Sequence, residues 1–253
     1  SAAEPADSLT PVAAALAFAL SPLVLLWGRI GVSDALFSAT LAGSLLLAWR
    51  SQADPHGRWW PAWPPLALAV LSKGPVALLL MALTLGLFAV LQGDGERLRR
   101  RLRPLLGLAV ATALALPWYA LALLREGRPF WTSFFGYHNL QRFTAVVNHH
   151  LQPWWFFGLV LLLANLPATP LLLLGLWRAL RRPPPPPERS LARYAACWLL
   201  AVLAFFTVAA TKLPSYWLPA TPAAGVLIVL AARSAGDASD HPAAPVQIGR
   251  AHV

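Results

Sequence analysis

Residues 104–124 read PLLGLAVATALALPWYALALL, an apolar run that is long enough to cross a bilayer as one helix. A spanning helix needs about 20 mainly apolar residues. Hydrocarbon offers no water to the backbone N–H and C=O groups, so such a run must satisfy them within a helix. Five arginines precede it within residues 97–103, and Arg125 follows it. The run therefore predicts a membrane-spanning helix with a strongly basic end.

The rest of the chain repeats this pattern. Eight apolar segments lie at approximately 11–27, 34–49, 60–72, 75–91, 104–124, 154–177, 193–210 and 216–232. The third is short and opens with tryptophans and prolines, which is typical of the headgroup interface. Of the 253 residues, 58% are hydrophobic and 12% are charged, whereas a soluble domain has about 25% charged residues. We expect an all-α fold, a polytopic transmembrane helical bundle of about eight spans.

The basic side chains are distributed unequally between alternating loops. One set of loops holds 13 of them, namely Arg50, Arg58, Arg97, Arg99, Arg100, Arg101, Arg103, Arg178, Arg181, Arg182, Arg189, Arg193 and Arg233. The other set holds six, namely Arg29, Lys73, Arg125, Arg128, Arg142 and Lys212. The positive-inside rule assigns the first set to the cytoplasm. The net charge of +10 thus reflects membrane topology, and we expect no nucleic-acid partner.

The chain reads as one transmembrane region, residues 1–232, followed by a polar tail, residues 233–253. The first residue is not Met, and we expect an N-terminal part to be missing. The last six residues, 248–253, resemble a translated sequencing adapter. Pro183–Pro187 predicts a stiff spacer. A single cysteine, Cys197, excludes an internal disulfide.

Four short polar motifs lie on the predicted outer side, at residues 28–34, 72–75, 137–143 and 211–216. In the first, Asp34 follows Ser33 at the start of an apolar segment. Either Ser33 caps the helix and the carboxylate favours the helix dipole, or the carboxylate faces an outer cavity near Arg29. In the second and fourth, Lys73 and Lys212 are lone cations close to a proline. Each lysine either snorkels to the surface at a turn or binds a phosphate at the membrane surface.

The long outer loop combines an aromatic helix with polar groups. Residues 130–143 predict an amphipathic helix at the interface, which would hold His138, Asn139 and Arg142 at headgroup depth. His149 and His150 are adjacent and cannot both face one metal, so we predict no divalent metal. Residues 154–157 (WWFF) are typical of an aromatic belt. No nucleotide-binding motif is present, so any chemistry is expected to use a membrane-borne donor.

Taken in order, these motifs resemble a known family. The motifs are Arg29 to Asp34, Ser72-Lys73-Gly74-Pro75, Leu116-Pro117-Trp118-Tyr119, His138-Asn139 with Arg142-Phe143 and Pro153-Trp154-Trp155, and Lys212-Leu213-Pro214-Ser215-Tyr216 with Leu218-Pro219. They resemble the bacterial branch of the protein mannosyltransferase-like family, which includes the lipid A aminoarabinose transferases, over roughly residues 10–232. These proteins are C-type integral membrane glycosyltransferases.

The resemblance implies transfer of a sugar, with inversion, from a polyprenyl-phosphate carrier to a lipid, glycan or protein acceptor. The reaction would occur on the periplasmic face of a bacterial inner membrane. It implies no cofactor beyond the polyprenyl-phosphate-linked donor, and partners among the membrane lipids. The predicted phosphate- or sugar-binding residues are Lys73, Arg29, His138, Asn139, Arg142, Lys212 and Tyr216.

Asp34 is the predicted catalytic residue, orienting the acceptor or a cation. The family's acidic residue in the first outer loop would lie upstream of Ser1, so we expect the general base there and an inactive fragment. A transporter or flippase for a polyprenyl-linked sugar is the alternative. It should show inverted repeats and mid-membrane ionisable residues, and the sequence shows neither.

Overall fold

The computed structural model describes residues 5–145, 152–182, 186 and 190–240 of the chain, with the backbone alone described at 5–8, 137–142 and 236–240. The predictions for His149 and His150, for most of the Pro183–Pro187 run and for residues 241–253 lie outside the described residues.

The described residues form helices and no strand, so the predicted all-α class is confirmed. The helices are α1 (Pro5–Ala19), α2 (Pro22–Trp27), α3 (Ser33–Ala53), α4 (Trp63–Lys73), α5 (Val76–Gln92), α6 (Gly95–Leu102), α7 (Pro104–Glu126), α8 (Arg128–Phe130), η1 (Trp131–Gln141), α9 (Arg142–Thr144), α10 (Phe156–Ala164), α11 (Thr169–Arg181), α12 (Leu191–Val208), η3 (Pro214–Ala220) and α13 (Thr221–Asp240). The last of these continues past residue 232, where the sequence predicted a polar tail to begin.

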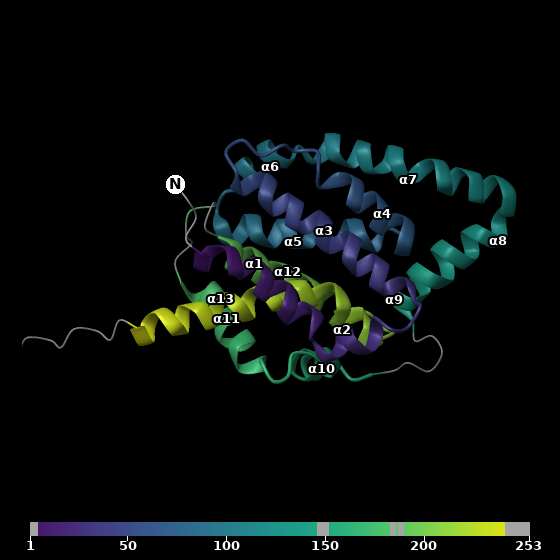
Figure 1. Ribbon diagram of the computed structural model, residues 1–253. Coiled ribbons are helices and arrows are strands. Elements are labelled where there is room, and N and C mark those ends of the chain that lie inside the picture. The colour runs from purple at the N-terminus through teal and green to yellow at the C-terminus, as the bar shows by residue number, and fades with distance from the viewer. Residues whose placement is uncertain (1–4, 146–151, 183–185, 187–189, 241–253) are drawn as a thin grey trace, which may run out of the picture.

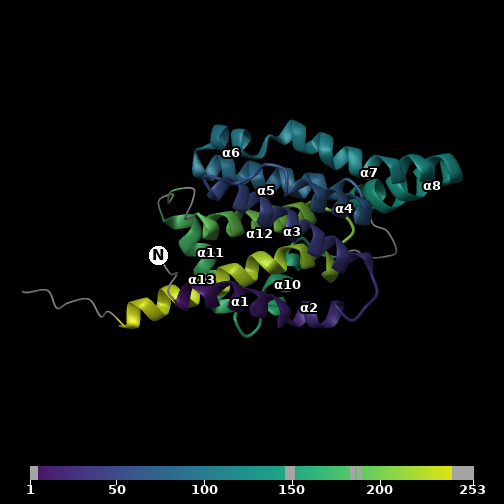
Figure 2. The same ribbon diagram turned by 45° about the horizontal axis from the view of Figure 1, so that its top comes forward.

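The helices pack in layers, with α3 and α12 between α5 and α7 on one side and α1 and α13 on the other (Figures 1 and 2). Helix α3 packs against α4, α5 against α12, and α1 against α13. Among the described residues, the three largest fully buried side chains, Trp198, Trp217 and Tyr194, come from α12 and η3. Tyr194 donates a hydrogen bond to the Leu45 carbonyl of α3 at 2.8 Å. This contact fixes α12 against α3, the two helices that lead to the candidate site.

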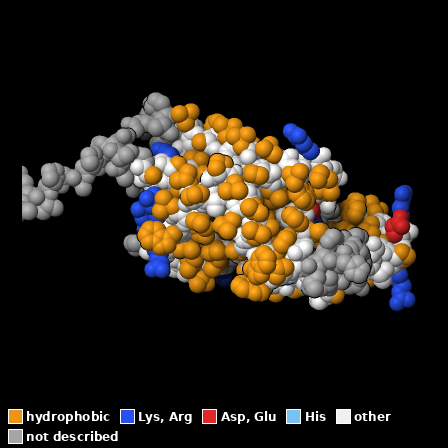
Figure 3. Space-filling model, turned by 90° about the horizontal axis from the view of Figure 1, so that it is seen from below, with side chains coloured by type: hydrophobic (Ala, Val, Ile, Leu, Met, Phe, Trp, Pro, Cys, Tyr) orange, Lys and Arg blue, Asp and Glu red, His pale blue; other side chains and the backbone are white. Residues whose placement is uncertain are grey.

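The helix surfaces that face away from the core of the bundle are largely apolar. Only 22% of the apolar stretch of α7 is buried, and the helix exposes Leu105 (84%) and Leu124 (83%). Figure 3 shows hydrophobic side chains across one face of the molecule, with Lys and Arg gathered toward its two ends. A soluble monomer rarely exposes such a continuous apolar surface. The protein is therefore built for a lipid surround.

Within the described residues, three helices are long and apolar enough to cross a membrane, Pro104–Glu126, Leu191–Val208 and Pro214–Ala235. A fourth arises if the bent pair α10 and α11 is one span. This is fewer than the eight spans expected. Helix α3 has 21 residues, but its buried Ser38, Ser44 and Ser51 make it more polar. Helix α4, at 11 residues, is too short.

The segment predicted at 154–177 as one run is two helices, α10 and α11, bent by 114°. Pro167 and Pro170 lie at the break, and proline has no N–H to continue a helix. Side chains satisfy the carbonyls that the break frees. Asn165 donates to the Leu161 carbonyl at 2.7 Å, and Thr169 donates to the Leu162 carbonyl at 2.6 Å. Such breaks are tolerated in membrane proteins where the freed groups find partners.

Arginines link the helix ends at the predicted cytoplasmic side. Arg97 bonds the Gln52 carbonyl, and Arg101 bonds the Pro55 carbonyl, so α6 closes over the end of α3. In α6 itself, hydrogen bonds from Arg100 and Arg99 hold the pKa of Glu96 below its usual range. The arginine clusters thus gather at one end of the bundle, which we call the arginine-rich end.

Candidate active site

Three helix ends meet at the other end of the bundle. Asp34 lies in the first turn of α3, Lys73 is the last residue of α4, and Tyr216 lies in η3. A carboxylate is favoured at a helix N-terminus and a cation at a C-terminus, because each complements the partial charge of the helix dipole. The chain therefore brings opposite charges together through the ordinary preferences of two helix ends.

Lys73 is the centre of the cluster. Its Nζ forms an ion pair with Asp34 Oδ1, and it lies 4.5 Å from the ring centroid of Tyr216 and 5.6 Å from that of Phe37. The side chains of Lys73 and Asp34 are 23% and 14% exposed. A cation over an aromatic face gains about 0.5–2 kcal/mol, more when it is desolvated. We call Asp34, Phe37, Lys73 and Tyr216 the Lys73 cluster.

Local sequence explains why Lys73 ends its helix there. Gly74 has φ of 83° and donates its N–H to the Val70 carbonyl at 2.7 Å, which closes α4. A side chain at that backbone conformation would be strained, so glycine fits it. Pro75 then caps α5 with φ of −66°. The Ser-Lys-Gly-Pro motif is therefore a sharp reversal that leaves Lys73 at the end of a helix, facing α3.

Helix α3 does not use the cap suggested by the sequence. Its N-cap residue is Val32, with no side-chain cap hydrogen bond, and Ser33 is already helical. The alternative in which Ser33 caps the helix is therefore wrong. Asp34 instead forms an ion pair with Lys73, a partner that neither of the two arrangements considered for it had named. Its role in the reaction stays a prediction.

Lys212 is buried, with 8% of its surface exposed. Its Nζ donates to the Ala209 carbonyl at 2.8 Å, at the end of α12. Next to it, Thr211 donates to the Ala145 carbonyl at 2.9 Å. The chain after α9 is thus tied to the same helix end. Lys212 lies in the connection between α12 and η3, and Tyr216 lies in η3.

The aromatic segment is helical, as predicted, but η1 is a π-helix. The ring of Phe134 in η1 stacks on that of Phe130 in α8, with ring centroids 5.5 Å apart and an interplanar angle of 10°. Tyr119 of α7 lies 5.6 Å from both Phe134 and Phe135. π-helical turns are rare and occur often at functional sites. Two aromatic contacts therefore fix η1 on the end of α7.

The structure describes less of the other residues predicted for the site. His138 and Asn139 lie in η1 and Arg142 begins α9, but their side chains are outside the described set. Arg29 is exposed in the turn before α3 and forms no ion pair with a described acidic residue. Among the described residues, no group of three His, Cys, Asp or Glu could hold a metal ion.

Two residues of the site were given no role in the sequence analysis. Phe37 is 1% exposed and faces Lys73. It lies one turn after Asp34 on the same helix face, and that spacing could have identified it. Tyr119 donates its hydroxyl to the Val70 carbonyl at 2.7 Å, which ties α7 to the last turn of α4. The sequence showed Tyr119 in a motif, but not its partner.

An apolar cavity of about 190 Å³ lies between α4, α5, α7 and η1. Its lining residues are Val70, Pro75, Leu78, Ala111, Thr112, Ala115, Leu116, Tyr119 and Phe135, from α4, α5, α7 and η1. Val70 and Pro75 stand on either side of Lys73 in the sequence. The cavity therefore borders the Ser-Lys-Gly-Pro turn that holds Lys73, although none of the four residues of the Lys73 cluster lines it.

Comparison with known proteins supports a membrane enzyme family. Residues 6–120 match the family described as dolichyl-phosphate-mannose-protein mannosyltransferase. The undecaprenyl phosphate-alpha-4-amino-4-deoxy-L-arabinose arabinosyl transferase of Pseudomonas aeruginosa is 34% identical over 225 residues, covering 84% of this chain and 38% of that protein. A second relative, undecaprenyl phosphate-alpha-4-amino-4-deoxy-L-arabinose arabinosyl transferase 1 from Sodalis glossinidius, is 33% identical over 230 residues. That match covers 86% of this chain and 37% of the relative. The chain thus spans under two fifths of the length of these relatives.

The fold has a counterpart among solved structures. ArnT from Cupriavidus metallidurans, bound to undecaprenyl phosphate, matches with a TM-score of 0.78 and 26% identity, over 90% of this chain and 42% of that one. The apo state of that protein matches with a TM-score of 0.59 at 24% identity. These matches agree with the ordered motifs and with the helical, lipid-facing bundle. The chain belongs to the protein mannosyltransferase-like family of integral membrane glycosyltransferases, in the branch of the aminoarabinose transferases.

Proposed function

We propose that this chain forms the donor-phosphate site of a membrane glycosyltransferase. The enzyme takes a sugar from a polyprenyl-phosphate carrier and transfers it, with inversion, to a lipid, glycan or protein acceptor. The observation that carries the proposal is the Lys73 cluster, where one cation is held at a helix end by Asp34 and Tyr216. Relatives described as undecaprenyl-phosphate-dependent transferases support it.

Lys73 would stabilise the departing phosphate. The bond between the anomeric carbon and a phosphate oxygen breaks, and its electron pair stays on that oxygen. A fixed ammonium group close to that oxygen lowers the energy of the transition state, because the charge develops where the cation already stands. Lys212, Arg29 and Arg142 are the further cations proposed for this phosphate. His138 and Asn139 of η1 are proposed to bind the sugar or phosphate.

Asp34 holds Lys73 in place rather than taking the acceptor's proton. The Asp34 carboxylate is already engaged by the Lys73 ammonium group, so we assign the acceptor's proton to a different residue. The acceptor oxygen attacks the face of the anomeric carbon opposite the phosphate, and its proton passes to another group, a base on that face. We propose that this base is the family's acidic outer-loop residue.

The apolar cavity between α4, α5, α7 and η1 would receive the first isoprene units of the carrier. Its lining is almost entirely hydrocarbon and aromatic, and Phe135 closes it on the η1 side. Burying apolar surface contributes about 25 cal/mol for each Å² removed from water. The phosphate would then sit at Lys73 with the chain entering between α4, α5 and α7. We propose that the reaction takes place on the side of the membrane where the Lys73 cluster lies, the periplasmic face of a bacterial inner membrane.

The test measures transfer from a labelled polyprenyl-phosphate sugar in membrane vesicles that carry the whole protein. Lys73→Ala should reduce transfer at least tenfold, a loss of about 1.4 kcal/mol or more. Arg125→Ala is the matched control, because Arg125 is an exposed cation near the same end of the bundle. It should leave transfer unchanged.

Equal transfer by Lys73→Ala and the unmodified protein would remove Lys73 from the mechanism. Movement of the labelled carrier across the bilayer, without transfer to any acceptor, would instead indicate a transporter or flippase.

A further inference from the structure

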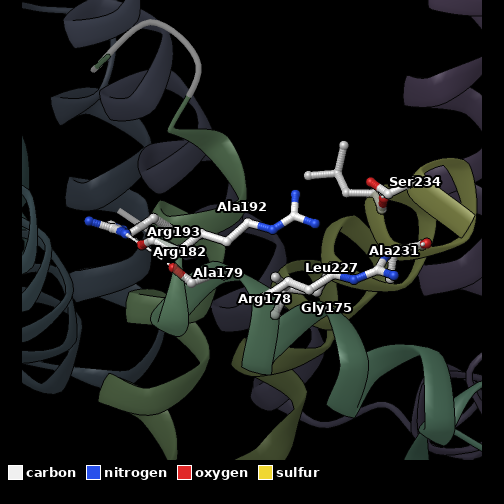
Figure 4. A pocket seen from close by; sticks show the side chains of 10 residues that line it. Gly175, Arg178, Ala179, Arg182, Ala192, Arg193, Leu227, Ala231 and Ser234 are labelled. Carbon is white, nitrogen blue, oxygen red and sulfur yellow. Dashed lines mark hydrogen bonds between the residues drawn. The ribbon is translucent and has the colours of Figure 1, made fainter. Parts of the chain in front are cut away.

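A pocket lined by three arginines lies at the arginine-rich end, away from the Lys73 cluster. It encloses about 250 Å³. The lining residues, shown in Figure 4, are Gly175, Arg178, Ala179, Arg182, Ala192, Arg193, Leu227, Leu230, Ala231 and Ser234. They come from α11, α12 and α13. Three of them are arginines and none is acidic, so the pocket concentrates positive charge.

Arg193 has a structural task. It is 5% exposed, and its guanidinium donates to the carbonyls of Ala179 (3.3 Å), Leu91 (3.0 Å) and Arg182. Two of these carbonyls belong to the C-terminal end of α11, where a cation complements the helix dipole. Its hydrogen bonds are thus explained by the fold. Among the described residues, no acidic side chain forms an ion pair with it.

Arg178 and Arg182 are less buried than Arg193. Arg178 reaches the Ala231 carbonyl of α13 at 3.5 Å, beyond the usual length of a hydrogen bond. Arg182 is exposed. Figure 4 shows Arg178 extending from α11 across the pocket toward Ala231. Arginine presents several N–H donors in a planar fork that matches a phosphate. Two such groups therefore flank an open space beside a third, buried cation.

The rest of the pocket is suited to a lipid. Leu227, Leu230 and Ala231 make its α13 wall apolar. On α11, Trp177 is 58% exposed beside Arg178. Tryptophan is enriched where a helix passes the headgroups. The pocket therefore combines positive charge with an apolar wall, which fits a phosphate that carries acyl chains.

We propose that this pocket binds the phosphate of an anionic phospholipid in the leaflet at the arginine-rich end. Arg178 and Arg182 contact the phosphate oxygens, and the α13 wall contacts the start of an acyl chain. Basic pockets between membrane helices are known to bind anionic head groups. The proposal is independent of the donor chemistry at Lys73.

The test uses the whole purified protein in neutral detergent, with lipid binding measured by native mass spectrometry and by titration. The probes are phosphatidylglycerol, cardiolipin, phosphatidylcholine and inorganic phosphate. The unmodified protein should retain phosphatidylglycerol or cardiolipin over phosphatidylcholine. The double variant Arg178→Gln/Arg182→Gln should bind these anionic lipids at least tenfold more weakly. Arg181→Gln is the matched control, because Arg181 is exposed on the same helix but does not line the pocket. It should bind like the unmodified protein.

The single variant Arg182→Gln changes an exposed side chain, so it tests the pocket without endangering the fold. It should show a smaller loss than the double variant. Anionic-lipid binding that is equal in the double variant and the control would overturn the proposal. So would equal retention of phosphatidylcholine. Displacement of the lipid by inorganic phosphate at matched concentration would assign the pocket to a free anion instead.

Discussion

At the scale of single residues, the site depends on how Lys73 is held. Asp34 neutralises its charge, and the faces of Tyr216 and Phe37 cover it. A charge near the membrane centre costs about 2.5–3.5 kcal/mol on insertion scales, so a lysine at a helix end with a carboxylate and aromatic faces is a far cheaper arrangement. Lys73 is held in place, yet still 23% exposed for a ligand.

Tyr216 tests the aromatic contribution. Tyr216→Leu removes the ring over Lys73 and should weaken carrier binding about tenfold, since about 1.4 kcal/mol lies within the range of a cation–π contact. Tyr216→Phe keeps the ring face and should lose much less. The dissociation constant for undecaprenyl phosphate, from titration in detergent, checks both. Equal weakening by the two variants would show that the hydroxyl, not the ring, matters.

At the scale of elements, α4 is positioned by α7. Tyr119 bonds the Val70 carbonyl, and Gly107 lets the Trp63 ring lie against the α7 backbone. A Cβ at Gly107 would come within 1.6 Å of the Trp63 ring. Small residues allow such close approach between membrane helices. The start and the end of α4 are therefore both fixed on α7, and Lys73 ends that helix.

Gly107→Ala should force these helices apart. Overpacking of this kind costs about 1–3 kcal/mol, so the thermal midpoint, followed by tryptophan fluorescence, should fall by several degrees. Gly86→Ala is the matched control, because nothing lies within 4 Å of a Cβ at Gly86. It should be neutral or slightly stabilising, since alanine favours a helix over glycine by about 1 kcal/mol. A midpoint unchanged by Gly107→Ala would contradict the close α4–α7 contact.

Sequence reasoning reached some of these elements and missed others. The all-α class and the distribution of charges could be predicted, because they follow from the lengths of the apolar runs and from the positions of the charged residues between them. Asp34, Lys73 and Tyr216 could be placed on one side, because each begins or ends an apolar run. Their mutual contact could not be predicted, since it depends on packing between segments far apart in the sequence. The break between α10 and α11 was missed because apolar residues on both sides conceal Asn165 and two prolines in a hydropathy average.

At the scale of the whole molecule, charge distinguishes two ends. Arginine clusters bond backbone carbonyls at one end, whereas the other end holds the Lys73 cluster. The two ends thus differ in kind as well as in number. The arginines of one end bond loops and helix ends together. At the other end, Lys73 lies at a turn that borders the apolar cavity.

Cysteine labelling tests this topology. Within this chain the one cysteine, Cys197, is buried, so it should contribute little background labelling. In intact spheroplasts, an impermeant maleimide should label Arg125→Cys and not Arg100→Cys, because Arg100 belongs to the end assigned to the cytoplasm. Permeabilised membranes should label both. Labelling of Arg100→Cys in sealed spheroplasts would reverse the orientation.

The most direct test of the account is the binding of undecaprenyl phosphate to the whole protein, measured as a dissociation constant. Lys73→Ala should weaken binding at least tenfold, Arg125→Ala should leave it unchanged, and un-phosphorylated undecaprenol should bind Lys73→Ala and the unmodified protein alike. That pattern would locate the phosphate at Lys73. Equal affinity of Lys73→Ala and the unmodified protein for undecaprenyl phosphate would contradict the central claim.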